Sequence, residues 1–126
     1  MITTLSLVVV AGGLGAAGRY TIDYMITQRV GGRLPWGTAV VNLSGSLALG
    51  LLAGMAMRIN LSQDLAIIVG GGFLGAYTTF STWMYQSLQL MENGRWAAAA
   101  VNVFGSALAG GAAAMLGLVS MWWLLG

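Results

Sequence analysis

The stretch from Gly75 to Trp83 carries three threonines and one serine, and it follows the glycine triplet 70–72 within a long apolar run. Glycine lowers helix stability, and threonine and serine hydroxyls can bond to nearby backbone groups. We therefore expect the helix to open here and expose backbone carbonyls. Irregular backbone survives at membrane depth only where it is buried in protein or lines a polar cavity, so this break predicts a functional site. A Gly/Thr-rich face for helix packing is the alternative.

Other uncharged polar side chains recur on helical faces within the apolar runs. At 3.6 residues per turn these faces are Thr38, Asn42 and Gly45; then Phe80, Trp83 and Ser87, with Thr79, Thr82 and Gln86 beside them; and finally Asn102, Ser106 and Gly110. A buried amide such as Asn42 needs hydrogen-bond partners, and its NH2 group offers two protons. For Asn42 and for the last face, the alternative is simple helix packing.

These side chains provide neutral donors, which suit an anion that must shed its water. Hydroxyls, amides and the positive edges of aromatic rings can replace the lost hydration. Proton-coupled pumps and multidrug exporters instead need an ionisable residue within a span. Asp23, Asp64 and Glu92 all lie close to the ends of the apolar runs. The pattern therefore argues against a proton-driven antiporter.

Composition sets the class of the protein. Of 126 residues, 58% are hydrophobic and only 6% are charged, against about 25% charged in soluble domains. We infer an integral, all-α membrane protein. The sequence has no cysteine or histidine, which excludes disulfides, thiolate metal sites and Ser-His or Cys-His catalysis. No enzymatic activity is expected, and five scattered arginines do not form a nucleic-acid patch.

Charges and turn formers divide the chain into four apolar segments, and a span needs roughly 20 apolar residues. The segments cover 2–28, 36–57, 65–91 and 96–125, which we interpret as a single transmembrane domain over 1–126. The first is expected to be a span and not a signal peptide, because no basic region precedes it. At about 1.5 Å per residue, the distance from Leu65 places the break in the third helix near the midplane.

Glycines and arginines bear on assembly. The 20 glycines cluster in the spans, and small residues let helices pack closely in lipid. Four closely packed helices cannot enclose a water-filled pathway, so any pore should lie between subunits. Arg29, Arg33 and Arg95 oppose Arg58 across the membrane, a small bias that would allow an antiparallel dimer. Arg19, four residues before Asp23, either snorkels with this local partner, keeps a vestibule positive or bonds a loop of the partner subunit.

Three motifs in order resemble a known family over essentially the full length. They are GGLGAAGRY at 12–20, GTAVVNLSG at 37–45 and, after Gly75, TTFSTW at 78–83. The chain resembles the Fluc fluoride channels, also called the CrcB family of fluoride exporters. The resemblance implies passive, fluoride-selective export that lowers cytoplasmic fluoride. It also implies two narrow pores in an antiparallel, dual-topology homodimer of the bacterial inner membrane.

The resemblance also assigns site residues. The pore asparagine corresponds to Asn42 and the first pore phenylalanine to Phe80, and the hydroxyl track corresponds to Ser81, Thr82 and Ser106. A structural sodium ion on the dimer axis is implied, held by the backbone carbonyls of Gly75 and Thr78 from both subunits. Oxygen ligands agree with the preference of a hard cation.

Two positions depart from the family pattern. Trp83 stands where the family has its second pore phenylalanine; the indole keeps a positive edge, adds an N–H donor and is bulkier. Gln86 replaces a frequent glutamate, which removes an anion-repelling group. Two other functions remain as alternatives, a small four-helix proton-coupled multidrug transporter and a non-transporting assembly subunit.

Overall fold

The computed structural model describes residues 2–126, and this part of the chain contains helices and no strand. The first two spans are the continuous helices α1 (Ile2–Val30) and α2 (Trp36–Arg58). The third span consists of α3 (Gln63–Ala66), the π-helical segment η1 (Ile67–Leu74), α4 (Gly75–Tyr77) and α5 (Ser81–Glu92). The fourth consists of α6 (Trp96–Ala100), the π-helical segment η2 (Val101–Gly105) and α7 (Ser106–Leu124).

Four helical stretches are long and apolar enough to cross a membrane, as the sequence predicted. They are Ile2–Val30, Trp36–Arg58, Gln63–Glu92 and Trp96–Leu124. Local chemistry explains their ends. Gly31 and Gly94 adopt positive φ angles of 79° and 72° in the connections, a conformation that glycine tolerates because it lacks a Cβ. The Ser62 hydroxyl accepts a hydrogen bond from the Leu65 N–H at 3.3 Å and caps α3.

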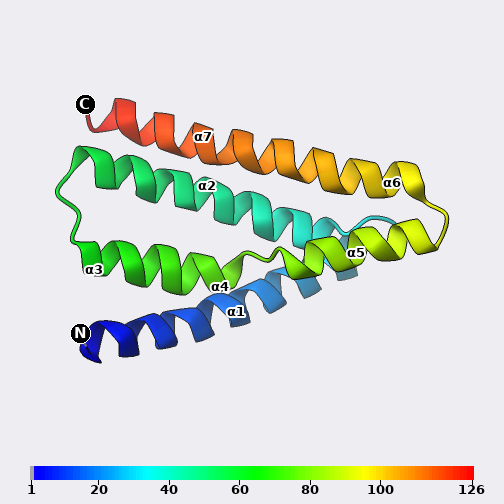
Figure 1. The fold of residues 1–126 in the computed structure, drawn as a ribbon, viewed down its shortest axis with the longest axis horizontal. Helices are drawn as coiled ribbons and strands as arrows, with labels where there is room; N and C mark the ends of the chain where they lie inside the picture. The colour runs from blue at the N-terminus through cyan, green and yellow to red at the C-terminus, as the bar shows by residue number, and fades with distance from the viewer. Residues whose placement is uncertain (1) are drawn as a thin grey trace.

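The helices pack in two groups, and both termini lie at the same end of the molecule (Figure 1). α2 packs mainly on α7, and α1 packs on η1 and α4. Glycines permit the close approach. A Cβ added at Gly50 would overlap the Ala114 carbonyl of α7, and one added at Gly15 would overlap the Phe73 carbonyl of η1. The backbones therefore touch in both groups, as expected where helices associate through small residues.

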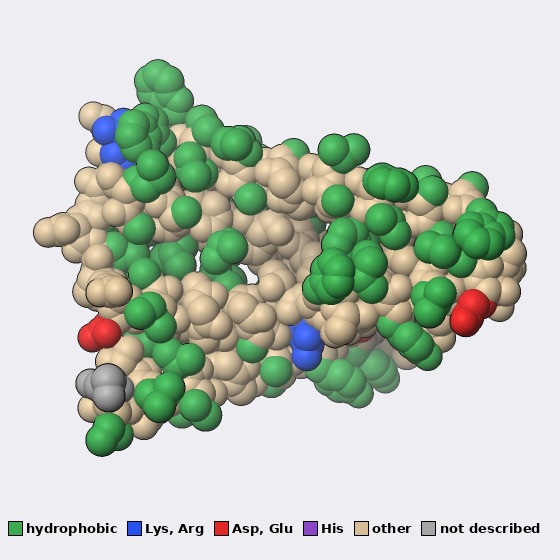
Figure 2. All heavy atoms as spheres, viewed as in Figure 1, with side chains coloured by type: hydrophobic (Ala, Val, Ile, Leu, Met, Phe, Trp, Pro, Cys, Tyr) green, Lys and Arg blue, Asp and Glu red, His purple; other side chains and the backbone are tan. Residues whose placement is uncertain are grey.

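The surface of the single chain is largely apolar. Buried hydrophobic residues are few, namely Val41, Leu74, Leu90 and Ala99, whereas many large apolar side chains are exposed. Green apolar side chains are spread over the visible face, acidic and basic side chains are sparse, and the face is hollowed near its middle (Figure 2). This surface suits contact with lipid or with another subunit, because a soluble monomer rarely exposes such large apolar areas.

Candidate functional site

The chain leaves the helix between α4 and α5. α4 ends at Tyr77, and Thr78 is extended, with φ −76° and ψ 160°. α5 begins at Ser81, so residues 78–80 lie outside the helices near the middle of the third span. Both the N–H and the hydroxyl of Thr78 donate to the Leu74 carbonyl at 3.0 Å. These two bonds complete the last turn before the chain becomes extended.

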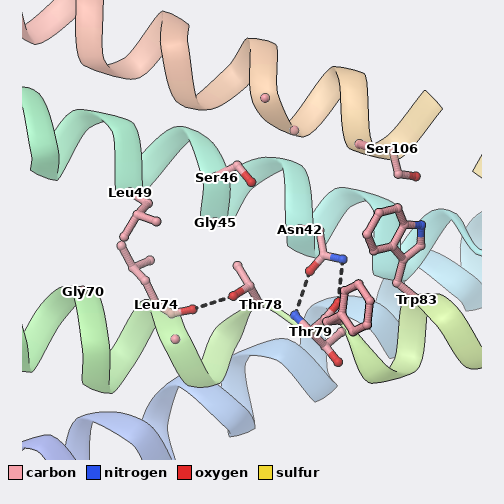
Figure 3. Close-up of a pocket in the computed structure, with 15 residues that line it drawn as sticks. Asn42, Gly45, Ser46, Leu49, Gly70, Leu74, Thr78, Thr79, Trp83 and Ser106 are labelled. Atoms are coloured by element: carbon pink, nitrogen blue, oxygen red, sulfur yellow. Dashed lines mark hydrogen bonds between the residues drawn. The ribbon is translucent and has the colours of Figure 1, made fainter. Parts of the chain in front are cut away.

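Asn42 on α2 pairs with the main chain of Thr79. Its Oδ1 accepts the Thr79 N–H at 2.8 Å, and its Nδ2 donates to the Thr79 carbonyl, also at 2.8 Å (Figure 3). In a continuous helix, the Thr79 N–H would bond to the Gly75 carbonyl four residues earlier. The asparagine takes this donor, so the Gly75 carbonyl is left without its helical partner. One of the two Asn42 N–H groups remains available.

The Thr79 side chain organises the start of α5. Thr79 is buried, and its hydroxyl accepts the Thr82 N–H at 3.3 Å. The same hydroxyl donates to the Thr82 hydroxyl at 3.2 Å and lies 3.4 Å from the Ser81 hydroxyl. It thus acts as a cap for a helix whose own N-cap residue, Phe80, makes no side-chain cap bond. Three hydroxyls are connected at the first turn of α5.

A central cavity of about 340 Å³ lies beside the non-helical residues. It brings together six of the predicted site residues, namely Asn42, Gly75, Thr78, Phe80, Trp83 and Ser106. The other lining residues are Gly45, Ser46, Leu49, Gly70, Leu74, Thr79, Ala107, Gly110 and Gly111, and none of the fifteen is charged. Figure 3 shows these groups converging from the second, third and fourth spans.

Thr82, Ser81 and Arg19 lie elsewhere. Thr82 lines a second cavity of about 190 Å³ together with Arg19 and Asp23, whereas Ser81 is exposed and lines neither cavity. Within residues 2–126 no salt bridge joins Arg19 to Asp23. Asp23 instead packs against Gly37 in the first turn of α2, where the positive end of the helix favours a carboxylate.

The two aromatic site residues meet edge to face. The rings of Phe80 and Trp83 are 5.7 Å apart at 85°, and Phe80 is 70% exposed. The indole N–H of Trp83, which the sequence offered as an additional donor, is already engaged, because it donates to the Asn102 carbonyl at 2.9 Å. The Gln86 Oε1 atom is buried without a hydrogen-bond partner.

Several features of the site escaped the sequence analysis. The pairing of Asn42 with Thr79 and the capping role of Thr79 were not predicted, although Thr79 belongs to the hydroxyl-rich stretch. The π-helical segments η1 and η2 were also missed. For η1 the available signal was its glycine triplet, because π-helical turns occur where a regular helix is interrupted and often at functional sites.

Comparison with known proteins identifies close relatives. A family model described as "CrcB-like protein, Camphor Resistance (CrcB)" matches residues 6–118. The chain is 45% identical over 118 residues to "Fluoride-specific ion channel FluC 1" of Symbiobacterium thermophilum, covering 92% of this chain and 95% of that protein. It is 42% identical over 110 residues to "Fluoride-specific ion channel FluC 2" of Mycobacterium tuberculosis, covering 87% and 84%. A FluC protein of Nitratidesulfovibrio vulgaris is 43% identical over 109 residues, covering 86% and 88%.

Proposed function

Because this chain belongs to the CrcB-like family, we propose that it is a fluoride-selective channel that exports fluoride passively and so lowers cytoplasmic fluoride. The chain is a multi-pass bacterial membrane protein with four spans. In such a setting a small anion must lose most of its water, and the protein must supply donors in return.

The observation that carries this proposal is the uncharged lining of the central cavity. Among residues 2–126, the second N–H of Asn42 and the hydroxyls of Ser46 and Ser106 donate no side-chain hydrogen bond, so these groups can donate to an ion. The rings of Phe80 and Trp83 add positive edges. A site of neutral donors suits an anion, whereas proton-coupled transport of cationic drugs needs a carboxylate inside a span.

We also propose an antiparallel homodimer with two pores. The cavity of one chain is open to the surface, and Phe80 beside it is 70% exposed. Exposed non-helical backbone is not tolerated against lipid, so a second copy is the natural cover for the chain at Phe80. The arginine balance, with Arg58 at the end of α2 and Arg29, Arg33 and Arg95 on the opposite side, is small enough to permit insertion in both orientations.

A structural sodium ion on the axis of this dimer is part of the proposal. The carbonyl of Gly75 has lost its helical donor to Asn42, and the carbonyl of Thr78 belongs to an extended residue. Both residues line the cavity. Carbonyl oxygens suit a hard cation. Two carbonyls from one chain are too few for such an ion, and the same pair from a second copy would complete the site.

The smaller cavity fits an entry vestibule. It joins Arg19 to Thr82, whose hydroxyl is bonded to that of Thr79. A positive side chain at the mouth of a pathway raises the local concentration of an anion. We therefore assign Arg19 to the vestibule, and Thr82 and Ser81 to the hydroxyl track that leads towards the central cavity.

Reconstitution tests the proposal. Purified protein in liposomes loaded with fluoride and chloride should release fluoride, recorded with a fluoride electrode, while a chloride electrode records retention of chloride. Liposomes without protein provide the leak rate. Equal release of the two halides, or fluoride release no faster than the leak, contradicts a fluoride-selective channel.

A further inference from the structure

A closed ring of hydrogen bonds joins α5 to η2 beside the central cavity. The Trp83 indole N–H donates to the Asn102 carbonyl at 2.9 Å. The Asn102 side-chain Nδ2 donates to the Ser87 hydroxyl at 2.8 Å. The Ser87 hydroxyl donates to the Trp83 carbonyl at 2.8 Å. Each of the three residues is therefore bonded to both of the others.

The ring is buried. Ser87 is 1% exposed and Asn102 is 7% exposed. A buried polar group that loses its partner keeps the full cost of its lost hydration. Removal of the Ser87 hydroxyl would leave the Asn102 Nδ2 donor unpaired, whereas removal of the Asn102 amide would leave the Ser87 oxygen without a donor although that hydroxyl still donates to the Trp83 carbonyl. Either loss opens the ring and lets α5 and η2 shift against each other. The ring holds the two helices in one relative position.

One carbonyl fixes two residues of the cavity wall. The Asn102 carbonyl accepts the Trp83 indole N–H and also the backbone N–H of Ser106, which its two lone pairs allow. Trp83 and Ser106 both line the central cavity. The separation between the indole and the Ser106 hydroxyl is thus set from a single point on η2.

We propose that Asn102 and Ser87 are positioning residues for the aromatic wall of the pathway, and that Trp83 presents its ring and not its N–H to the ion. This inference rests on the proposed fluoride channel. The indole is anchored by Asn102 and packed edge to face against Phe80. A phenylalanine at position 83 would have no such anchor, because its ring carries no donor.

A direct role for Asn102 is the competing explanation, and it makes a different prediction. Asn102 lines a groove of about 230 Å³ that also contains Asn42 and Ser106, so its amide could contact an ion itself. In that case its removal would slow fluoride flux whatever residue occupies position 83. If it acts through Trp83, the effect must vanish once the indole N–H is absent. A double-mutant cycle separates the two.

Fluoride flux should be measured for Asn102→Ala and Ser87→Ala, each in the natural chain and in the Trp83→Phe background. We expect each to lower flux about three- to tenfold in the natural chain, the effect of one misplaced hydrogen bond, and to change it little in the Trp83→Phe background. Ser87→Thr keeps the hydroxyl and should keep the flux. Gln89→Ala is the matched control, because it removes an exposed bond to Tyr85 on the same helix.

Indole hydrogen exchange gives a readout independent of flux. In dimers labelled with ¹⁵N-tryptophan, the resonance missing from Trp83→Phe identifies the Trp83 N–H. This proton should exchange slowly in the natural chain, faster in Asn102→Ala and Ser87→Ala, and unchanged in Gln89→Ala. The inference is overturned if the exchange rate of the Trp83 indole proton is the same in Asn102→Ala and Ser87→Ala as in the natural chain. It is also overturned if Asn102→Ala lowers fluoride flux equally in both backgrounds. Absence of fluoride flux in the natural chain refutes the channel instead, while the exchange data still report on the ring.

Discussion

The side-chain amide of Asn42 pairs with the backbone of Thr79 much as a neighbouring strand would, with one donor and one acceptor bond of 2.8 Å each. This pair spans 37 positions in the sequence. It provides hydrogen-bond partners for the N–H and carbonyl of Thr79, which lies between the end of α4 and the start of α5. The residue proposed to meet the ion therefore also maintains the shape of the backbone around it.

Asn42→Ala should impair both conduction and stability. The N–H and carbonyl of Thr79 would lose their partners, which costs about 1–3 kcal/mol for each buried group. We expect the thermal midpoint of the dimer in detergent to fall and fluoride flux to decrease by about tenfold or more, since 1.4 kcal/mol corresponds to tenfold. Electrode-recorded efflux and a thermal melt measure the two effects.

Ser44→Ala is the control for this variant, because Ser44 lies on the same helix at an exposed position. The substitution removes a hydroxyl that bonds the Tyr77 hydroxyl and the Val41 carbonyl. It should leave flux near that of the natural chain. Flux in Asn42→Ala equal to that in Ser44→Ala would show that the amide does not shape the pathway.

Two glycines of α1 should respond in opposite ways to alanine. A Cβ at Gly15 overlaps the Phe73 carbonyl, whereas nothing lies within 4 Å of a Cβ at Gly13. Gly15→Ala forces α1 away from η1 and should cost about 1–3 kcal/mol. Gly13→Ala should be neutral or slightly stabilising, by up to about 1 kcal/mol from helix propensity. Thermal melts compare them, and equal midpoints would contradict the close packing of α1 on η1.

Sodium should stabilise the assembly if the carbonyls of Gly75 and Thr78 bind it. Replacing sodium with N-methylglucamine should lower the thermal midpoint of the dimer, because a ligand that binds only the folded state stabilises it by mass action. Adding sodium back should restore the midpoint in a saturable manner. A midpoint independent of sodium over the titration contradicts the proposed ion site.

Fluoride flux should not require a proton gradient. No residue of the central cavity is ionisable in the range of about pH 6 to 8. Efflux corrected for leak should therefore be the same at pH 6 and at about pH 8 with equal pH on both sides. An imposed pH gradient should not drive accumulation of a cationic dye. Dye uptake driven by protons would favour the multidrug transporter instead.

The sequence alone determined the class of the protein and predicted the stretch that contributes to its candidate site. Four apolar runs became four helices, and the match of three motifs to the CrcB family was confirmed. The glycine- and threonine-rich stretch contains the non-helical residues 78–80. These features could be predicted because hydropathy, turn-forming residues and low helix propensity are properties of contiguous residues.

Only the tertiary structure decided which side chains from different helices contact one another. It paired Asn42 with Thr79, placed Thr82 beside Arg19 and not in the central cavity, and tied the Trp83 indole to Asn102. Each relationship depends on how far one helix is rotated and shifted against another. That geometry follows from close contacts of glycines between helices that are distant in sequence, such as Gly50 against Ala114. The helical periodicity of a single span carries no information about these contacts.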